Sequence, residues 1–183
     1  KQHLEFCRDI AQKFNNDYGT DNFLKIPEPL IQKDFSRIMS LKDGSKKMSK
    51  SELSDLSRIN LTDGKDLIIN KIKKAKTDTL PLPKTTKELD LRLEAKNLLG
   101  IYSCLTNSTI EKSVQIFADK NFSKFKEELS QIVINKIEPI SSEIKKLLND
   151  QSYLDQILLD GVEKANVIAA KKIKSMKEII GFS

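Results

Sequence analysis

Residues 46–51 read KKMSKS, a run in which lysine and serine side chains surround a single methionine. The run shows neither the 3.6-residue period of a helix nor the two-residue period of a strand. Lys47 and Lys50 stand three residues apart, and Ser49 and Ser51 each add a hydroxyl group and a backbone N–H. Lysine is a compact point charge on a flexible stem, so two lysines on one short loop can contact a single triphosphate. A solvated basic surface loop is the alternative interpretation.

Transfer at the α-phosphate of ATP, with release of pyrophosphate, is the chemistry that such a loop suits. Negative charge builds up on the transferred group and on the leaving group, and cations placed on those oxygens stabilise it. Met48 is a soft apolar anchor that can pack under an adenine ring or against the base of the loop. Gly44 allows the loop to move, so that it can close after ATP binds. The chain has no GxxxxGKS or GxxxxGKT sequence, which excludes a P-loop.

The composition favours a polyanionic partner. The 183 residues include 32 lysines and arginines against 26 aspartates and glutamates, a formal net charge of +6, which suits RNA or a nucleotide. The two cysteines, Cys7 and Cys104, lie far apart and no Cys/His cluster exists, so we expect no metal site. No apolar run approaches the ~18–20 residues of a membrane span, and no signal-peptide pattern is present. We therefore expect a cytoplasmic protein that does not bind a membrane.

The N-terminal part of the chain, which must position the loop, combines several types of predicted secondary structure. Residues 1–18 have a helical pattern, which begins without a methionine and suggests a cut chain, and residues 23–31 read as the end of a strand broken by prolines. Residues 35–41 are either a short strand or an irregular turn. Residues 42–64 are polar and predict a long mobile loop with at most one turn of helix. The N-terminal part therefore resembles the tail of an α/β domain.

From residue 65 onward the pattern is helical throughout. Pro139 is expected to interrupt a stripe that includes Phe122 and Phe125, which we interpret as core, and Ser108 is expected to cap the following helix. Asp63, Asp66 and Asp78 are interpreted as caps and helix-end charges, and the single histidine, His3, as structural or exposed. The predicted helical segments are 65–78, 87–105, 110–117, 122–137, 141–150 and 152–181.

Several stretches besides KMSKS carry a resemblance to a known family. KMSKS, at residues 47–51, is the second signature of class I aminoacyl-tRNA synthetases. The accompanying stretches are KQHLE at 1–5, RIMSL at 37–41, KIKKAKTD at 71–78, RLEAKNLLGIYSCL at 92–105 and LDQILLDGVEKANVIAAKKI at 154–173. Together they make the chain similar, over essentially all of its length, to the bacterial-type tryptophanyl-tRNA synthetases.

The resemblance implies a mostly α-helical fold. Residues 1–64 would be the C-terminal part of a Rossmann-type α/β catalytic domain with the KMSKS loop, and residues 65–183 a helical domain that binds the tRNA anticodon. It also implies ATP-binding residues, of which Lys47 and Lys50 would be catalytic. These residues are Ile38 and Met39 on the adenine side and Lys47, Met48, Ser49, Lys50 and Ser51 on the phosphates.

The activity that the resemblance implies is tryptophan–tRNA ligation. ATP, with Mg2+ on its phosphates, would convert tryptophan to tryptophanyl-adenylate, which is then transferred to tRNA(Trp) by an enzyme that is a homodimer at full length. The family's HIGH-like motif and tryptophan pocket fall upstream of residue 1, so we expect a C-terminal part that is inactive by itself. A tyrosyl-tRNA synthetase relative and a non-catalytic helical RNA-binding module are the alternatives.

Overall fold

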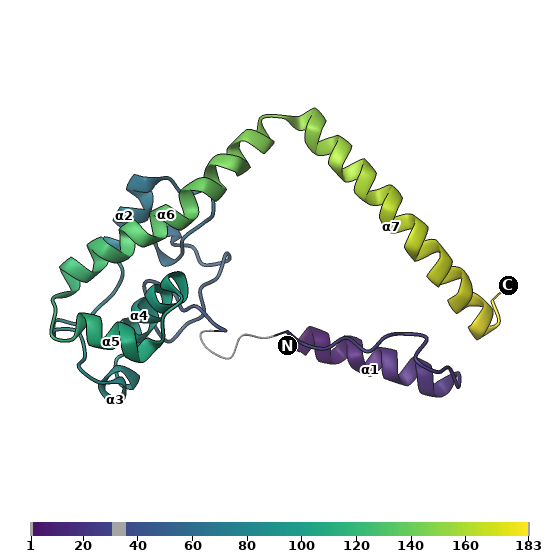
Figure 1. Cartoon of the computed structure of the whole chain (residues 1–183), viewed down its shortest axis with the longest axis horizontal. Helices are drawn as coiled ribbons and strands as arrows, with labels where there is room; N and C mark the ends of the chain where they lie inside the picture. Colours follow the sequence, from purple (N-terminus) through teal and green to yellow (C-terminus); the bar gives the residue numbers. More distant parts are fainter. Residues whose placement is uncertain (1, 31–35, 183) are drawn as a thin grey trace. The chain divides into compact units, whose positions relative to one another are not determined.

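The computed structural model describes residues 2–30 and 36–182, and its secondary structure there is almost entirely helical (Figure 1). This confirms the predicted mostly α-helical fold. In chain order the elements are α1 (Gln2–Asp17), η1 (Asp55–Ser57, one 3-10 turn), α2 (Lys65–Lys73), α3 (Thr86–Asp90), α4 (Leu93–Thr106), α5 (Ile110–Phe117), α6 (Phe122–Leu148) and α7 (Gln151–Ile180).

The chain divides into two compact units. The first contains residues 1–33 and 150–183, and the second contains residues 34–149. The two units are defined by which residues of the chain contact one another. The predicted boundary between residues 64 and 65 was instead inferred from the domains of the family that the sequence resembles. That boundary falls inside the second unit and stays a prediction.

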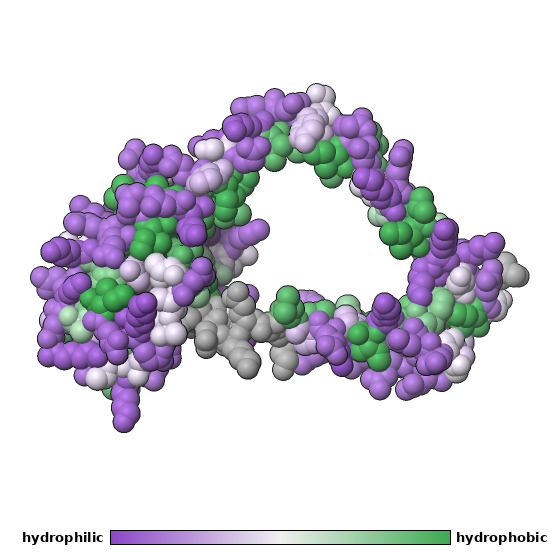
Figure 2. Space-filling model, viewed as in Figure 1, coloured by the Kyte–Doolittle hydropathy of each residue, from purple (hydrophilic) through white to green (hydrophobic). Residues whose placement is uncertain are grey.

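The first unit is built on α1, the segment that follows it and α7. Asn15, which is largely buried, accepts a hydrogen bond from the Leu24 N–H at 2.9 Å and donates to the Leu24 carbonyl at 2.8 Å. The Lys172 ammonium of α7 lies 3.6 Å from the centre of the Phe23 ring. No described residue of α7 is buried, and Figure 2 shows apolar side chains along its surface.

The strand end predicted at residues 23–31 does not form over its described part, residues 23–30. Pro27 and Pro29 have no N–H to donate to a neighbouring strand. The backbone groups of Leu24 are already satisfied by the Asn15 side chain. Residues 36–41 are irregular, as one of the two interpretations expected, apart from an isolated antiparallel bridge between Met39 and Lys47.

The core lies in the second unit, where α2 and α4 pack on α6 and α5 packs on α4. Its centre is a group of three aromatic rings, with Phe117 packed edge-on against Tyr102 at 4.8 Å and against Phe125 at 4.7 Å between ring centres. Phe125 is fully buried, which confirms that the stripe on α6 is core. Full burial of one such side chain contributes about 1.5–3 kcal/mol.

Some predicted helix ends and breaks were wrong. Arg92 divides the predicted helix 87–105 into α3 and α4: its backbone is not helical, with φ −123° and ψ 80°, and its guanidinium pairs with Asp78 at 2.5 and 2.8 Å. These bonds hold the pKa of the Asp78 carboxyl below its usual range. α6 continues through Pro139, which removes one backbone hydrogen bond but leaves the turns on either side to hold the helix. The cap of α5 is Thr109 instead of Ser108: its hydroxyl accepts from the Lys112 N–H at 3.3 Å.

The loop of residues 42–64 contains only one turn of helix, η1, as predicted, and a buried charge attaches it to α2. The Lys71 ammonium is fully buried and lies 2.6 Å from the Asp63 carboxylate and 2.7 Å from that of Asp55. Asp63 also accepts hydrogen bonds from the backbone and side chain of Asn60. The interpretation of Asp63 as a cap or helix-end charge was therefore wrong, because Gly64 is the N-cap of α2 and Asp63 pairs with the buried Lys71 ammonium.

Gly44 brings the same loop against the start of α4. A Cβ atom at this position would lie 2.8 Å from the Glu94 nitrogen and 2.8 Å from the Leu93 carbonyl carbon. Both are backbone atoms of the helix, so neither can swing aside. Only glycine permits this approach, which gives Gly44 a packing role that loop mobility alone did not predict.

We predict that Lys71→Met destabilises the protein by about 3 kcal/mol, because it leaves the Asp63 carboxylate buried without a cation. Chemical denaturation followed by circular dichroism measures the change. Lys65→Met is the matched control, since the Lys65–Glu138 pair is exposed at 2.9 Å and an exposed pair contributes less than about 1 kcal/mol. Equal effects of the two substitutions would contradict the role of the buried pair.

We also predict that Gly44→Ala destabilises the protein by about 1–3 kcal/mol, the usual range for an overpacked site. The thermal unfolding midpoint measures it. Gly64→Ser is the control: no atom lies within 4 Å of a Cβ there, and serine is a favourable residue at the N-cap of α2. A loss of stability from Gly64→Ser as large as that from Gly44→Ala would show that the close approach is not the cause.

Candidate functional site

The structure brings the two predicted parts of the ATP site side by side. The Ser40 N–H donates to the Lys46 carbonyl at 2.8 Å, and the Met48 N–H donates to the Ile38 carbonyl at 3.0 Å. Between these two bonds Met39 and Lys47 form the antiparallel bridge. The predicted adenine-side residues therefore lie directly beside the start of the KMSKS loop (residues 47–51).

Polar and apolar side chains separate at this site. Lys47, Ser49, Lys50 and Ser51 are exposed, whereas Met48 is half-buried and packs against the core. Ile38 and Met39 are also half-buried. The loop thus presents charges and hydroxyl groups to the solvent while its methionine anchors it, as the sequence predicted for Met48.

The two lysines of the motif make no ion pair with any described residue, and their neighbour Lys46 does. Lys46 lies 3.5 Å from the Asp43 carboxylate. Hydrogen bonds from Ser45, followed by those from Lys46, hold the pKa of the Asp43 carboxyl below its usual range. Lys47 and Lys50 therefore keep their charge available to an anionic ligand.

Both ends of the loop are attached to the second unit. On the N-terminal side the Leu41 N–H donates to the Ser57 carbonyl at 2.8 Å, and the Leu41 carbonyl accepts from the Lys76 N–H at 2.7 Å. On the C-terminal side the Arg58 guanidinium donates to the Glu52 carbonyl at 2.9 Å. The loop is therefore a short exposed segment between two fixed points.

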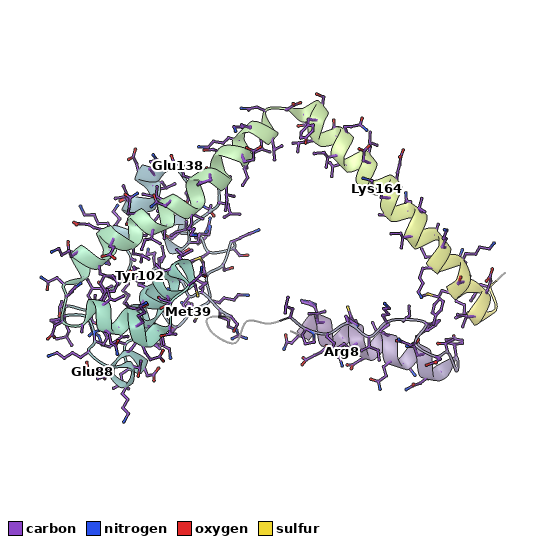
Figure 3. The ribbon with its side chains drawn as sticks, in the orientation of Figure 1. Arg8, Met39, Glu88, Tyr102, Glu138 and Lys164 are labelled. Atoms are coloured by element: carbon purple, nitrogen blue, oxygen red, sulfur yellow. The ribbon has the colours of Figure 1, made fainter. Side chains whose placement is uncertain are left out.

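Asn97 is the residue of this region that the sequence did not reveal. It is largely buried, and its side-chain amide pairs with both backbone groups of Met39, the residue labelled in Figure 3. The sequence did contain one indication of this role: Asn97 is a polar residue at a position where the helical pattern of residues 92–105 predicts burial, and a buried polar side chain requires a hydrogen-bond partner.

A groove of about 530 Å3 between α2 and α6 is separate from these residues. Its wall includes Ile69, Lys73, Phe122 and Lys126, and none of the predicted ATP-binding residues lines it. The Lys126 ammonium donates to the Ala75 carbonyl at 2.7 Å, just beyond the C-terminus of α2, and partial burial lowers its pKa. The groove is therefore not the site of the KMSKS loop.

Other kinds of site find no support in the part of the chain that the structure describes. No group of three or more histidine, cysteine, aspartate or glutamate side chains there is placed to hold a metal ion. None of the helices described is both long enough and apolar enough to cross a membrane. The KMSKS loop and the adjoining residues 38–39 offer a different kind of site. Two unpaired cations and two hydroxyl groups beside an apolar strip suit a ligand with a polyanionic part and a flat apolar part.

Comparison with known proteins gives tryptophan–tRNA ligases among the relatives of this chain. The tryptophan–tRNA ligase of Caulobacter vibrioides is 48% identical over 182 residues, which are 100% of this chain and 53% of that protein. That of Rickettsia felis is also 48% identical, over 100% of this chain and 54% of the relative. The chain thus spans about half the length of the curated relatives it matches.

Solved structures agree with this. The crystal structure of tryptophanyl-tRNA synthetase from Mycoplasma pneumoniae superposes with a TM-score of 0.82 at 25% identity, over 100% of this chain and 54% of that one. The enzyme from Campylobacter jejuni, solved with ADP and tryptophan, gives a TM-score of 0.66 at 27% identity, over 98% and 54% of the two chains. The family model for class I tRNA synthetases (W and Y) matches residues 1–140. From its sequence and its fold, the chain belongs to the class I tRNA synthetase family of the tryptophan and tyrosine enzymes.

Proposed function

We propose that this chain is the C-terminal part of a tryptophan–tRNA ligase and supplies its ATP-phosphate loop. The observation that carries the proposal is the placement of Lys47 and Lys50, exposed and without an ion pair to any described residue, beside residues 38–39. Identity of 48% to named tryptophan–tRNA ligases supports tryptophan over tyrosine as the amino acid. A helical RNA-binding module has no need of this loop.

In the proposed reaction a carboxylate oxygen of tryptophan attacks the α-phosphorus of ATP. The new bond joins that oxygen to phosphorus, the bond from phosphorus to the bridging oxygen breaks, and pyrophosphate leaves. Lys47 and Lys50 stabilise the charge on the phosphate oxygens, and the hydroxyl groups of Ser49 and Ser51 add hydrogen bonds. Ile38, Met39 and Met48 provide the apolar surface for the adenine ring.

The remaining parts of the proposal concern partners. Mg2+ is expected to arrive with the ATP phosphates, and tRNA(Trp) to accept the tryptophanyl group. Residues 65–183 form the proposed tRNA-binding domain and residues 1–64 the end of the catalytic domain, in a cytoplasmic homodimer of the complete enzyme. The net charge of +6 and the exposed lysines of α7, among them Lys164 and Lys171, support the tRNA contact.

We predict that Lys50→Ala in the complete enzyme slows tryptophan-dependent pyrophosphate exchange about 100-fold, because one charge contact with a transition state contributes about 3 kcal/mol. The affinity for tryptophan should change little. Exchange kinetics and a tryptophan binding titration measure the two quantities. Lys46→Ala is the matched control, since Lys46 is a neighbouring exposed lysine that pairs with Asp43. Equal losses of exchange rate and tryptophan affinity would argue against a phosphate role for the loop.

We further predict that the 183-residue chain binds tRNA(Trp) and that the dissociation constant rises about 10-fold or more between 50 and 200 mM salt. Lysine–phosphate contacts release counterions, which makes the affinity depend steeply on salt. Filter binding at the two concentrations measures it, and Lys50→Ala should leave it unchanged because the loop serves ATP. Undetectable binding at the lower concentration would remove the tRNA contact from the proposal.

A further inference from the structure

Asn97 lies in the second turn of α4 and is only 6% exposed. Its amide oxygen accepts a hydrogen bond from the Met39 N–H at 2.9 Å, and its amide nitrogen donates to the Met39 carbonyl at 2.8 Å. One side chain thus satisfies both backbone groups of Met39, as a residue on a neighbouring strand does. The two residues are 58 positions apart, so the contact exists only in the folded chain.

The geometry of the bridge explains why Met39 needs this partner. The bonds that join the two segments come from Ser40 and Ile38, on either side of Met39. In an antiparallel pair of this kind the backbone groups of the middle residue point away from the partner segment. Those of Met39 therefore face away from Lys47, and Asn97 is what they meet there.

A second contact joins the same helix to the loop that follows residues 38–39. Gly44 lies against Leu93 and Glu94, one turn of α4 before Asn97. Residues three or four apart lie on one face of a helix, so this face of α4 contacts the chain at Met39 and Gly44, two points that precede Lys47. The Glu94 carboxylate also pairs with Lys76 at 3.0 Å, which holds the pKa of Glu94 below its usual range.

We infer that Asn97 is a positioning residue for the ATP site. It holds the adenine-side residues 38–39 in place, and through the Met39–Lys47 bridge it fixes the position of Lys47 and of the start of the loop that carries Lys50. The inference rests on the proposed function and assigns a role to a residue outside the KMSKS loop. Asn97 contacts the backbone of Met39 and acts on ATP through it, so tryptophan binding does not depend on it. Only a primary amide of this length both donates and accepts at these distances.

The test compares Asn97→Asp with the unsubstituted complete enzyme. Aspartate keeps the shape, but a carboxylate oxygen replaces the donor and faces the Met39 carbonyl. We expect kcat/KM for ATP to fall about 10-fold or more, as small misplacements of a reacting group do, with tryptophan affinity within about 2-fold. Amide hydrogen exchange at Ser40 and Met48, measured by mass spectrometry, should become faster because their bonds cross the bridge.

Ser103→Ala is the matched control. Ser103 lies on the same helix and is also buried, and its hydroxyl bonds to Leu99 and Ser113 instead of to Met39. If Asn97→Asp folds poorly, Asn97→Ala removes both bonds without adding a charge and gives the same comparison. Unchanged amide exchange, or equal losses for ATP and tryptophan, overturns the inference. An unsubstituted enzyme without tryptophan-dependent exchange would refute the proposed function, while amide exchange still tests the Asn97–Met39 coupling.

Discussion

The buried ammonium group of Lys71 is the interaction on which the arrangement of the second unit depends. Its two carboxylate partners, Asp55 and Asp63, come from the polar loop, whereas Lys71 belongs to a helix packed in the core. A charge removed from water is stable only when it is paired and hydrogen-bonded, so the loop has to follow the path that brings both carboxylates to it. The segment that continues from the KMSKS loop is thereby attached to the core by electrostatics, in addition to the packing of Ile59 against the core.

Two asparagine side chains hydrogen-bond the backbone N–H and carbonyl of an extended residue, as a neighbouring strand would in a sheet. Asn15 pairs with both backbone groups of Leu24, and Asn97 does so with those of Met39. Buried backbone groups require partners, and a side-chain amide provides a donor and an acceptor in one plane. This allows two extended segments to keep a defined path among helices, and one of them carries the adenine-side residues of the proposed ATP site.

The accuracy of the sequence-based expectations follows from the range of the interactions involved. The apolar stripe with Phe125 was predicted because helical periodicity acts within one or two turns. The break at Arg92 and the role of Asp63 were missed, because each depends on a partner at least eight residues away, Asp78 in one case and Lys71 in the other. The continuation of α6 through Pro139 was missed for the opposite reason. The local tendency of proline to interrupt a helix was expected to prevail, but the hydrogen-bonded turns on either side hold the helix together.

The sequence by itself determined the helical class of the fold, the KMSKS motif and the family to which the chain belongs. All three depend on residue types and their spacing, which are visible in the sequence itself. Only the tertiary structure decided that residues 38–39 lie beside Lys47, that Lys46 is paired while Lys47 and Lys50 meet no described counter-charge, and that the Asn97 side chain pairs with the backbone of Met39. The physical reason is that a hydrogen bond or an ion pair between distant residues leaves no periodic trace in the sequence, because its geometry arises only when the helices pack.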